Sequence, residues 1–263
     1  MAELSPNSIA TSRGVTLHLQ GVRRVFAKAG APYAQGQVVI DGFDLEVAEG
    51  EFLAILGPSG CGKSTLLRLI ARLAAPDGGK IQMEPEGFRT GFVFQDAHLL
   101  PWRTVLDNAA LPLELQGMER SARYDKARTT LAHVGLGDAE QKYPAELSGG
   151  MRMRVSLARA LVTEPHLLLM DEPFAALDEI TRFQLEAQLR ALWQARGMTV
   201  IFVTHSITEA AFLANRAIVL SRRGGKILLD HRMFLPTQRD DELRGDPRLG
   251  REMKTLMAAM PTE

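Results

Sequence analysis

The sequence predicts an α/β fold: a parallel sheet flanked by helices, with a small antiparallel sheet near the N-terminus and a helical lobe inserted near the middle. Two observations predict the parallel sheet. Residues 52–56, 167–170 and 199–203 are short, continuous apolar runs, which are typical of strands covered on both faces. Helical patterns separate most of the runs, and strand, helix, strand at these lengths gives parallel strands joined by right-handed crossovers.

Three further strands complete the prediction. Residues 43–47 alternate apolar and acidic side chains, the period-two pattern of a half-buried strand, and indicate an antiparallel sheet within the first fifty residues. Apolar runs at 91–94 and 217–220 predict two more strands of the parallel sheet.

A long helix is predicted between residues 178 and 197. Its apolar residues recur at i, i+4, i+7 and i+8 and share one face: Leu185, Leu189, Leu192 and Trp193. Gly197 is placed to end this helix, because glycine readily adopts the left-handed conformation found past a helix C-terminus.

The predicted helical lobe covers about residues 99–163, which hold three helix-like segments and no convincing strand. We divide the chain into a flexible tail at 1–12, a main domain at 13–235 and a helical tail at 236–263. Apolar residues of this last segment are predicted on one helical face: Leu249, Met253, Leu256, Met257 and Met260. The sequence leaves open whether the tail regulates the protein, stabilises a dimer or packs on its own domain.

The composition excludes several classes of protein. The 263 residues are 46% hydrophobic and 24% charged, with 31 basic and 31 acidic side chains, unlike collagen-like, disordered or disulfide-scaffold chains. A net charge of zero supplies no global field for nucleic acid, so we expect no nucleic-acid partner. One cysteine requires no oxidising compartment, and no apolar stretch approaches the roughly 20 residues that span a bilayer. We therefore expect a cytoplasmic protein.

A glycine-rich loop after the 52–56 strand matches the pattern G-x-x-x-x-G-K-[ST], which binds phosphates through backbone N–H groups at a helix N-terminus. Its residues are Gly57, Pro58, Ser59, Gly60, Cys61, Gly62, Lys63, Ser64 and Thr65. Lys63 is expected to reach the β and γ phosphates of ATP, and the Ser64 hydroxyl to bind Mg²⁺. The alternative is a glycine-rich turn with a solvated lysine. We interpret Cys61 as a small neutral residue of the loop and not as a redox-active thiol.

Two acids, Asp171 and Glu172, follow the 167–170 strand at its carboxyl end, where α/β sheets bind ligands. Asp171 is expected to hold Mg²⁺ through water, and Glu172 to deprotonate the attacking water as a general base. Alone, two acids at the end of a strand would favour a structural interpretation. The phosphate loop favours the catalytic one.

Further motifs occur in a fixed order: Gln95, the sequence LSGGM at 147–151, the two acids, Ala176-Leu177-Asp178 and His205. With the phosphate loop, they resemble the nucleotide-binding domain of ATP-binding cassette (ABC) ATPases over about residues 15–229. The resemblance implies a RecA-like P-loop NTPase core, hydrolysis of ATP with Mg²⁺ as cofactor, and a second copy of the chain as a partner.

The resemblance also implies roles for single residues. The signature motif, which binds the γ-phosphate of ATP held by the opposite subunit, falls on Ser148, Gly149 and Gly150. Gln95 resembles a ligand of Mg²⁺ and water, Asp178 a residue of the dimer interface, and His205 a catalytic histidine that contacts the γ-phosphate. Structural alternatives stay open: helix N-caps for Ser148 and Asp178, a surface amide for Gln95 and a structural histidine for His205.

An aromatic ring upstream of the phosphate loop is expected to stack on adenine. Phe26 lies at about the family position and Tyr33 is close by, so both stay open, as does a packing role for Phe26. The remaining histidines show no metal-ligand spacing: His18, His98, His133, His166 and His231.

Three stretches resemble the ATPase subunits of bacterial importers for nitrate, sulfonate, taurine and related compounds: residues 94–102, Asp107-Asn108, and residues 171–178 followed by Thr181-Arg182. This resemblance implies uptake of a small solute through a separate membrane permease, with a periplasmic solute-binding protein as an indirect partner. It also implies a location on the inner face of the cell membrane. In such importers the segment after Gln95 lines a groove for a coupling helix of the membrane subunit. Four residues of this segment are suitably apolar for such a groove: Leu99, Leu100, Pro101 and Trp102. The alternative is that they fill the core of the helical lobe.

Four positions depart from the family pattern. Met153 stands where glutamine is usual, Ser206 where an acid commonly follows the histidine, and Arg72 where glycine often closes the helix after the phosphate loop. Arg223-Gly224-Gly225 replaces the usual Arg-Pro-Gly. None of these changes removes a catalytic group, but they weaken any assignment of the transported compound.

Two other functional classes share the catalytic motifs: the ATPase of a lipid-trafficking or export complex, and a non-transport ABC ATPase acting on nucleic acid or ribosomes. Members of the second class usually carry two such domains or a long coiled-coil insertion, and this sequence has neither. An ATPase subunit does not touch the transported compound, so its sequence does not name it.

Overall fold

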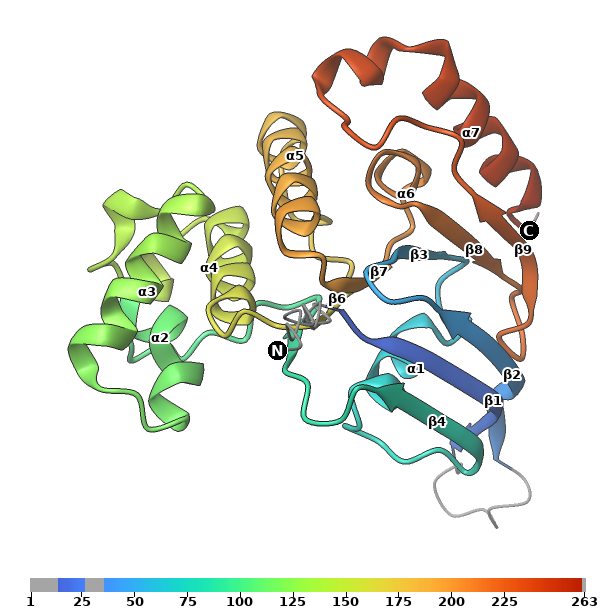
Figure 1. Cartoon of the computed structure of the whole chain (residues 1–263), viewed down its shortest axis with the longest axis horizontal. Coiled ribbons are helices and arrows are strands. Elements are labelled where there is room, and N and C mark those ends of the chain that lie inside the picture. The colour runs from blue at the N-terminus through green and yellow to red at the C-terminus, as the bar shows by residue number, and fades with distance from the viewer. Residues whose placement is uncertain (1–13, 27–35, 262–263) are drawn as a thin grey trace, which may run out of the picture.

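The structure, a computed structural model, describes residues 14–26 and 36–261 (Figure 1). Within these ranges the strands form two sheets, one of three strands in the order β2-β1-β4 and one of six in the order β5-β6-β7-β3-β8-β9. The predicted tail at 1–12 and Tyr33 lie outside the described residues. Among the residues that are described, no helix has the length and apolar composition that crossing a bilayer requires.

The six-stranded sheet confirms the predicted α/β fold. In the described part of the chain, five of its strands run parallel: β3 (Phe52–Leu56), β5 (Thr90–Val93), β6 (Leu167–Asp171), β7 (Thr199–Val203) and β8 (Arg216–Leu220). Each coincides with a predicted strand to within one residue at either end. The sequence analysis missed β9 (Ile227–Arg232), which pairs antiparallel with β8 at the sheet edge. Its side chains alternate between half-buried and exposed, and its apolar run ends after three residues, before polar Asp230, His231 and Arg232.

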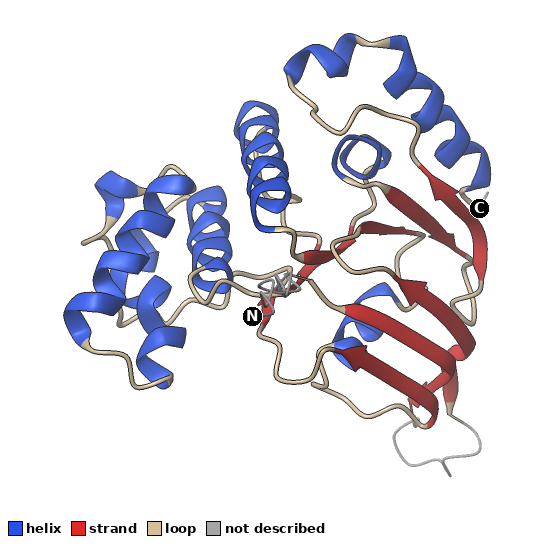
Figure 2. Cartoon of the chain, viewed as in Figure 1, coloured by secondary structure: helices blue, strands red, loops and turns tan. Residues whose placement is uncertain are grey.

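The central strands are buried on both faces because different elements cover each face. Leu53 of β3 packs in one core cluster with α1 (Lys63–Ile70) and the three-stranded sheet. Phe52 points the opposite way, into a second cluster shared with α5 (Glu179–Arg196) and α6 (Ile207–Leu213). Figures 1 and 2 show α1 between the two sheets and α5 and α6 on the far side of the larger one. This double cover explains the continuous apolar runs.

The smaller sheet is antiparallel throughout. In it, β1 (Thr16–Phe26) lies between β2 (Gln37–Val47) and β4 (Gly78–Glu84). This confirms the antiparallel sheet predicted within the first fifty residues, and β2 includes the predicted strand at 43–47. The sequence analysis missed β4, whose polar residues leave most of its positions at least partly exposed.

Between β5 and β6 the chain is described throughout and contains three α-helices and no strand, as predicted. These helices, which form the lobe at the left of Figures 1 and 2, are α2 (Val105–Leu115), α3 (Arg120–His133) and α4 (Gly149–Leu161). The domain boundaries at residues 13, 99, 163 and 236 remain predictions.

The long predicted helix is confirmed as α5. The Asp178 side chain accepts a hydrogen bond from the Thr181 N–H at 2.9 Å and begins the helix. Gly197, with φ of 66°, ends it. The predicted apolar face points inward, and the ring of Trp193 meets that of Phe52 at 5.8 Å between centroids.

The C-terminal tail packs on the main domain. It comprises a 3₁₀ helix, η4, and an α-helix, α7: Asp241–Gly245 and Pro247–Ala259. Leu249 and Leu256 are buried in the cluster that contains α6. The prediction that Met257 shares this face is wrong, because its side chain is 62% exposed. Glu252 lies in the buried stripe instead, with its carboxylate 2.6 Å from Nε2 of His231.

A strained residue follows α1 and provides a test of the backbone. Arg72 has φ of 57°, in the left-handed region where a Cβ is unfavourable, and it is exposed. We expect Arg72→Gly to raise the free energy of unfolding by about 1 kcal/mol and the melting temperature by about 2–4 °C. Thermal unfolding without nucleotide measures this. Arg72→Ala keeps the Cβ and is expected to gain nothing, so an equal gain in both variants would contradict the explanation.

Candidate nucleotide site

The carboxyl ends of four parallel strands meet at one edge of the larger sheet. The phosphate loop follows β3, Gln95 lies just past β5, Asp171 ends β6, and His205 lies just past β7. Parallel pairing therefore brings predicted site residues from four distant stretches to the same edge.

The phosphate loop leads directly from β3 into α1. Gly62 is the N-cap residue of α1, with φ of 108°, and a Cβ added to it would lie 3.1 Å from Cγ1 of Val39. Both the backbone conformation and the contact with β2 therefore require glycine. The loop borders an open cleft of about 330 Å³, whose lining includes Val39, Gln95 and Glu172. The loop residues in this lining are Ser59, Gly60, Gly62, Lys63, Ser64 and Thr65.

Lys63 lies inside the curve of the loop. Its Nζ donates hydrogen bonds to the carbonyl oxygens of Gly57 at 2.8 Å and Pro58 at 3.1 Å, and the residue is only 5% exposed. Neutral carbonyls satisfy its donors without neutralising its charge, so an anion in the cleft would be strongly attracted. Backbone N–H groups at the start of α1 add to this attraction.

Cys61 fills space within the loop. It is buried, and its Sγ lies 2.9 Å from the position that a Cβ on Gly57 would take. Burial raises the pKa of the Cys61 thiol, which keeps it protonated and weakly reactive. These observations agree with a small neutral residue and not with redox chemistry.

Asp171 and Ser64 bring two oxygen ligands together. The Ser64 hydroxyl donates to Oδ1 of Asp171 at 3.0 Å, and Asp171 is only 5% exposed. Burial raises the pKa of the Asp171 carboxyl, so a cation beside it would favour the charged form. No cluster of three or more His, Cys, Asp or Glu side chains capable of holding a metal occurs among the described residues. A few oxygens next to a phosphate loop fit Mg²⁺, which takes its remaining ligands from phosphates and water.

Glu172 and His205 contact each other across the site. The Glu172 Oε2 lies 3.1 Å from Nδ1 of His205, and the imidazole is largely exposed to solvent. Glu172 has φ of 47°, and its N–H donates to the Val203 carbonyl at 2.9 Å. A positive φ at a non-glycine residue costs of order 1–3 kcal/mol, and such strain clusters at functional sites. The strained backbone is held by the neighbouring strand.

Gln95 lies at the cleft with an exposed side chain. The residues after it are held by Arg159 of α4, a contact that the sequence analysis missed. The Arg159 guanidinium donates to the carbonyls of Ala97 at 2.7 Å and His98 at 2.9 Å. This contact ties the segment after Gln95 to the helix that begins with the signature motif. The sequence gives little signal for this contact, because its acceptors are backbone carbonyls, which every residue type has.

The signature motif opens α4. The Ser148 side chain accepts a hydrogen bond from the Met151 N–H at 3.2 Å, and Ser148 is exposed while Gly149 is half-buried. A Cβ added to Gly150 would lie 2.8 Å from Cδ2 of Leu177, so a larger residue here would displace the end of that side chain. Of the described residues, those lining the phosphate cleft do not include the motif. Within one copy, the structure does not bring the two halves of the predicted site together.

Two predicted residues have structural contacts of their own. Asp178 caps α5, and hydrogen bonds from Thr181 lower the pKa of its carboxyl. Phe26 ends β1 with 46% of its surface exposed, and the Arg24 guanidinium lies 5.2 Å from the centre of its ring. Phe26 pairs with Gln37 of β2, the strand that brings Val39 to the cleft. Tyr33, the other aromatic prediction, lies outside the described residues.

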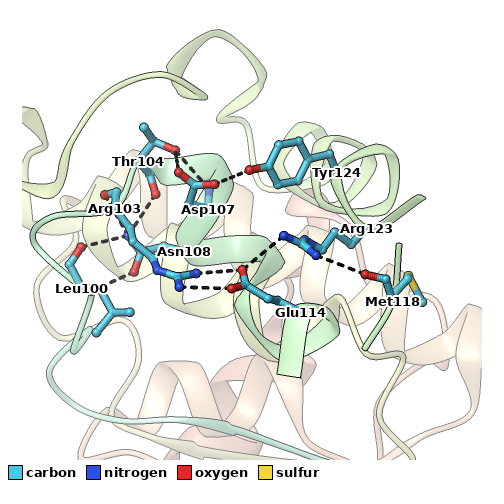
Figure 3. A network of polar contacts seen from close by, with 9 residues as sticks. All are labelled: Leu100, Arg103, Thr104, Asp107, Asn108, Glu114, Met118, Arg123 and Tyr124. Atoms are coloured by element: carbon cyan, nitrogen blue, oxygen red, sulfur yellow. Dashed lines mark hydrogen bonds and ion pairs between the residues drawn. The ribbon is translucent and has the colours of Figure 1, made fainter. Parts of the chain in front are cut away.

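The loop before α2 is held in place by Asn108, which is fully buried (Figure 3). Its Oδ1 accepts from the Leu100 N–H at 2.8 Å, and its Nδ2 donates to the carbonyls of Leu100, Arg103 and Thr104. Asp107 extends the network by accepting from the Tyr124 hydroxyl at 2.5 Å. The loop is therefore fixed on the helical lobe by polar contacts, with Leu99 and Leu100 half-buried and Trp102 exposed.

A double ion pair secures the end of the same loop. Arg103 contacts both oxygens of Glu114, at 2.9 Å and 3.2 Å, and Arg123 lies 3.5 Å from the same carboxylate (Figure 3). The network leaves Trp102 71% exposed, which contradicts the interpretation that this ring fills the core of the lobe. Leu99 is partly buried against the core. Leu115, at the end of α2, is 80% exposed.

Comparison with known proteins decides the family. The residue pattern of the family described as "ABC transporter" matches residues 40–175. The aliphatic sulfonates import ATP-binding protein SsuB of Cupriavidus necator is 43% identical over 257 residues, covering 94% of this chain and 80% of that protein. The chain belongs to the ABC transporter family. A second ABC relative, the taurine import ATP-binding protein TauB of Escherichia coli K12, is 46% identical over 198 residues, covering 73% of this chain and 78% of that protein.

Solved ABC structures share the fold. The dimeric structure of MJ0796, a bacterial ABC transporter cassette, has a TM-score of 0.75 and 31% identity, covering 82% of this chain and 98% of the other. A dimeric post-hydrolysis state of the same cassette, bound to ADP and Pi, has a TM-score of 0.74 with the same identity and coverage. The chain is therefore an ABC ATPase that binds and hydrolyses ATP, and the resemblance drawn from its motifs is confirmed.

Proposed function

We propose that this ABC ATPase is the energy-coupling subunit of an importer for a small solute of the nitrate, sulfonate or taurine kind. Two copies act together with a separate membrane permease at the inner face of the cell membrane, and a periplasmic solute-binding protein acts indirectly. No nucleic-acid partner is proposed. Support comes from the two relatives, which are ATP-binding proteins of aliphatic sulfonate import and taurine import, and from the dimeric state of the matching cassettes.

One observation carries the proposal of a working dimer. The cleft at the sheet edge collects Lys63, Gln95 and Glu172, whereas Ser148 lies on the helical lobe and is not part of the described lining. A signature motif that binds the γ-phosphate must therefore come from a second copy, with Asp178 at the interface. Each ATP then lies between the loop of one copy and the helix N-terminus of the other.

Within one copy, different residues bind the phosphates, the adenine and Mg²⁺ and act on the attacking water. Lys63 and the loop N–H groups hold the phosphates, and Phe26 stacks on adenine. Mg²⁺, when bound by Ser64, Gln95 and Asp171, neutralises charge on the β and γ phosphates. Glu172 takes a proton from the attacking water, and His205 contacts the γ-phosphate while its Nδ1 lies against the Glu172 carboxylate.

The loop at residues 99–102, in which Pro101 and Trp102 are exposed, is the surface we assign to the permease. Its partly buried hydrogen-bond network holds Trp102 outward, and a large exposed aromatic residue is typical of an interface hot spot. Purification of the tagged chain from membranes, with identification of the co-purifying permease by mass spectrometry, tests the whole proposal. Recovery of an export or lipid-trafficking complex instead would overturn it.

The general base is tested by Glu172→Gln. The amide keeps the shape of the carboxylate but cannot take a proton, so turnover is expected to fall by at least 10²-fold. ATP binding is expected to persist, and a closed dimer should accumulate on size-exclusion chromatography. Residual hydrolysis near the wild-type rate would remove the assignment.

The requirement for a second copy is tested by Ser148→Arg. The added side chain is expected to block the γ-phosphate of the partner's ATP and abolish hydrolysis. Binding of a fluorescent ATP analogue to dilute, monomeric protein should be unchanged, since Ser148 lies outside the monomer's cleft. Loss of binding to the monomer would show that the motif does not act across the dimer.

The permease surface is tested by Trp102→Ser. Removing the exposed ring is expected to weaken association with the permease about tenfold or more while leaving the ATPase rate of the isolated protein unchanged. Leu73→Ser is a matched control, because Leu73 is also exposed, at 59%, but lies beyond α1. Equal losses of permease binding in both variants, or none in Trp102→Ser, would contradict the assignment.

A further inference from the structure

The helix α6 begins directly after His205, and its first turn holds the backbone on both sides of the histidine. The Thr204 hydroxyl donates to the buried Glu209 carboxylate at 2.5 Å and accepts from the Ser206 N–H at 3.0 Å. The Ser206 hydroxyl in turn accepts from the Glu209 N–H at 3.3 Å. His205 therefore stands between two residues that are fixed to α6, and a shift of this helix carries the imidazole with it.

The opposite end of α6 is held by two buried arginines from outside the helix. Nη1 of Arg239, in the segment between β9 and α7, donates to three carbonyls, those of Ala211 at 3.0 Å, Phe212 at 2.7 Å and Ala214 at 3.0 Å. Arg190 of α5 donates to the remaining carbonyl of this run, that of Leu213. Four consecutive carbonyls at the helix C-terminus thus accept from guanidinium groups, where positive charge also complements the helix dipole.

These arginines also bind the segment that precedes η4. The Arg190 Nη2 donates to the Thr237 carbonyl at 2.9 Å, and the Arg239 Nε donates to the Pro236 carbonyl at 3.0 Å. Both residues are at most 9% exposed, and burial lowers the pKa of Arg239 to about 10 and that of Arg190 to about 9. Each guanidinium donates both to the end of α6 and to the segment before η4, so the segment and the end of α6 are held as one unit.

A third arginine continues the connection toward α7. The Arg244 guanidinium of η4 lies 3.8 Å from the ring centre of Phe183 and 3.9 Å from that of Phe212. Its Nη2 donates to the buried Glu186 carboxylate at 2.9 Å. Figure 1 shows the C-terminal segment running along α6, on the side away from the sheet. The segment is thus fixed to α5 as well as α6.

We propose that Arg239 is a positioning residue for ATP hydrolysis, through which the C-terminal segment sets the place of α6 and so the place of His205 against Glu172. This inference rests on the proposed role of His205. It assigns the tail a part in turnover that the sequence left open. Arg239 is not among the residues that line the phosphate cleft, and its Nη1 donates to the opposite end of α6 while its Nε donates to Pro236.

The first test compares three full-length variants. Arg239→Met removes the charge and the donors at similar length, and is expected to lower kcat about tenfold with little change in KM for ATP, since small displacements at a reacting centre cost this much or more. Arg239→Lys keeps the charge and part of the hydrogen bonding, and is expected to recover much of the loss. Arg248→Met is the control, because this arginine is on the same tail but half exposed and bound to Asp246.

A double-mutant cycle separates positioning from general damage. In a His205→Ala background, measured with γ-labelled ATP, Arg239→Met is expected to cost less than about twofold, because the group it positions is gone. Equal losses in the two backgrounds, or no loss in wild type, would overturn the inference while leaving the role of His205 intact. If His205→Ala itself leaves kcat unchanged, the proposed role of His205 fails and this inference fails with it.

A structural readout covers the case of a poorly folding Arg239→Met. Hydrogen exchange of the α6 amides in Arg239→Lys is expected to rise, while exchange of β3 and α1 stays at the wild-type level. Unchanged protection of α6 together with a lowered kcat would contradict a connection through the helix.

Discussion

The site depends on parallel strands that are buried on both faces. Side chains of β3 alternate between a cluster with α1 and a cluster with α5 and α6, so neither face can slip without exposing apolar surface. In-register pairing of β3 with β7 and of β6 with β7 then fixes where each strand ends. The phosphate loop, Asp171 and the residues after Val203 follow from those endpoints. The packed core thus positions the site residues, because it fixes the residue at which each strand ends.

Buried or partly buried cations bound to backbone carbonyls recur in this protein. Lys63 binds carbonyls of the phosphate loop, Arg159 binds the segment after Gln95, and Arg190 and Arg239 bind the end of α6. Each contact satisfies carbonyl oxygens that lack partners in a regular helix or strand. The loops around the nucleotide are thereby held by specific, directional contacts, and only Lys63 lies where its charge can also serve a ligand.

The sequence predicted the elements that have strong local signals. Continuous apolar runs marked the five parallel strands, and the apolar stripe of α5 with Asp178 and Gly197 at its ends marked that helix. It missed β4 and β9, because strands with polar, partly exposed residues resemble loops in a single sequence. Met257 was wrongly placed on the buried face of α7, which instead includes Glu252, a charged residue that pairs with His231 of the distant strand β9.

The candidate site likewise contains residues that the sequence predicted and contacts that it did not. The phosphate loop, Asp171, Glu172 and Gln95 were predicted in place, because their residue types and spacing are dictated by phosphate chemistry. The contact of Arg159 with Ala97 and His98, and those of Arg239 with α6, have carbonyl acceptors that any residue type would supply. Such contacts depend on tertiary structure alone, and the strained backbone of Glu172 is of the same kind.

In the proposed role of the loop around Trp102, the rigidity of its backbone would affect how selectively it binds the permease. Asn108 fixes its backbone from inside, so the ring is presented in a set orientation before any partner arrives. Binding then loses little backbone entropy, and a partner of the wrong shape cannot be accommodated by refolding the loop. The shape of this loop would then determine which permease the protein binds. Moving the loop sequence alone into another ATPase would not transfer that selectivity, because the Asn108 side chain that fixes the loop would be missing.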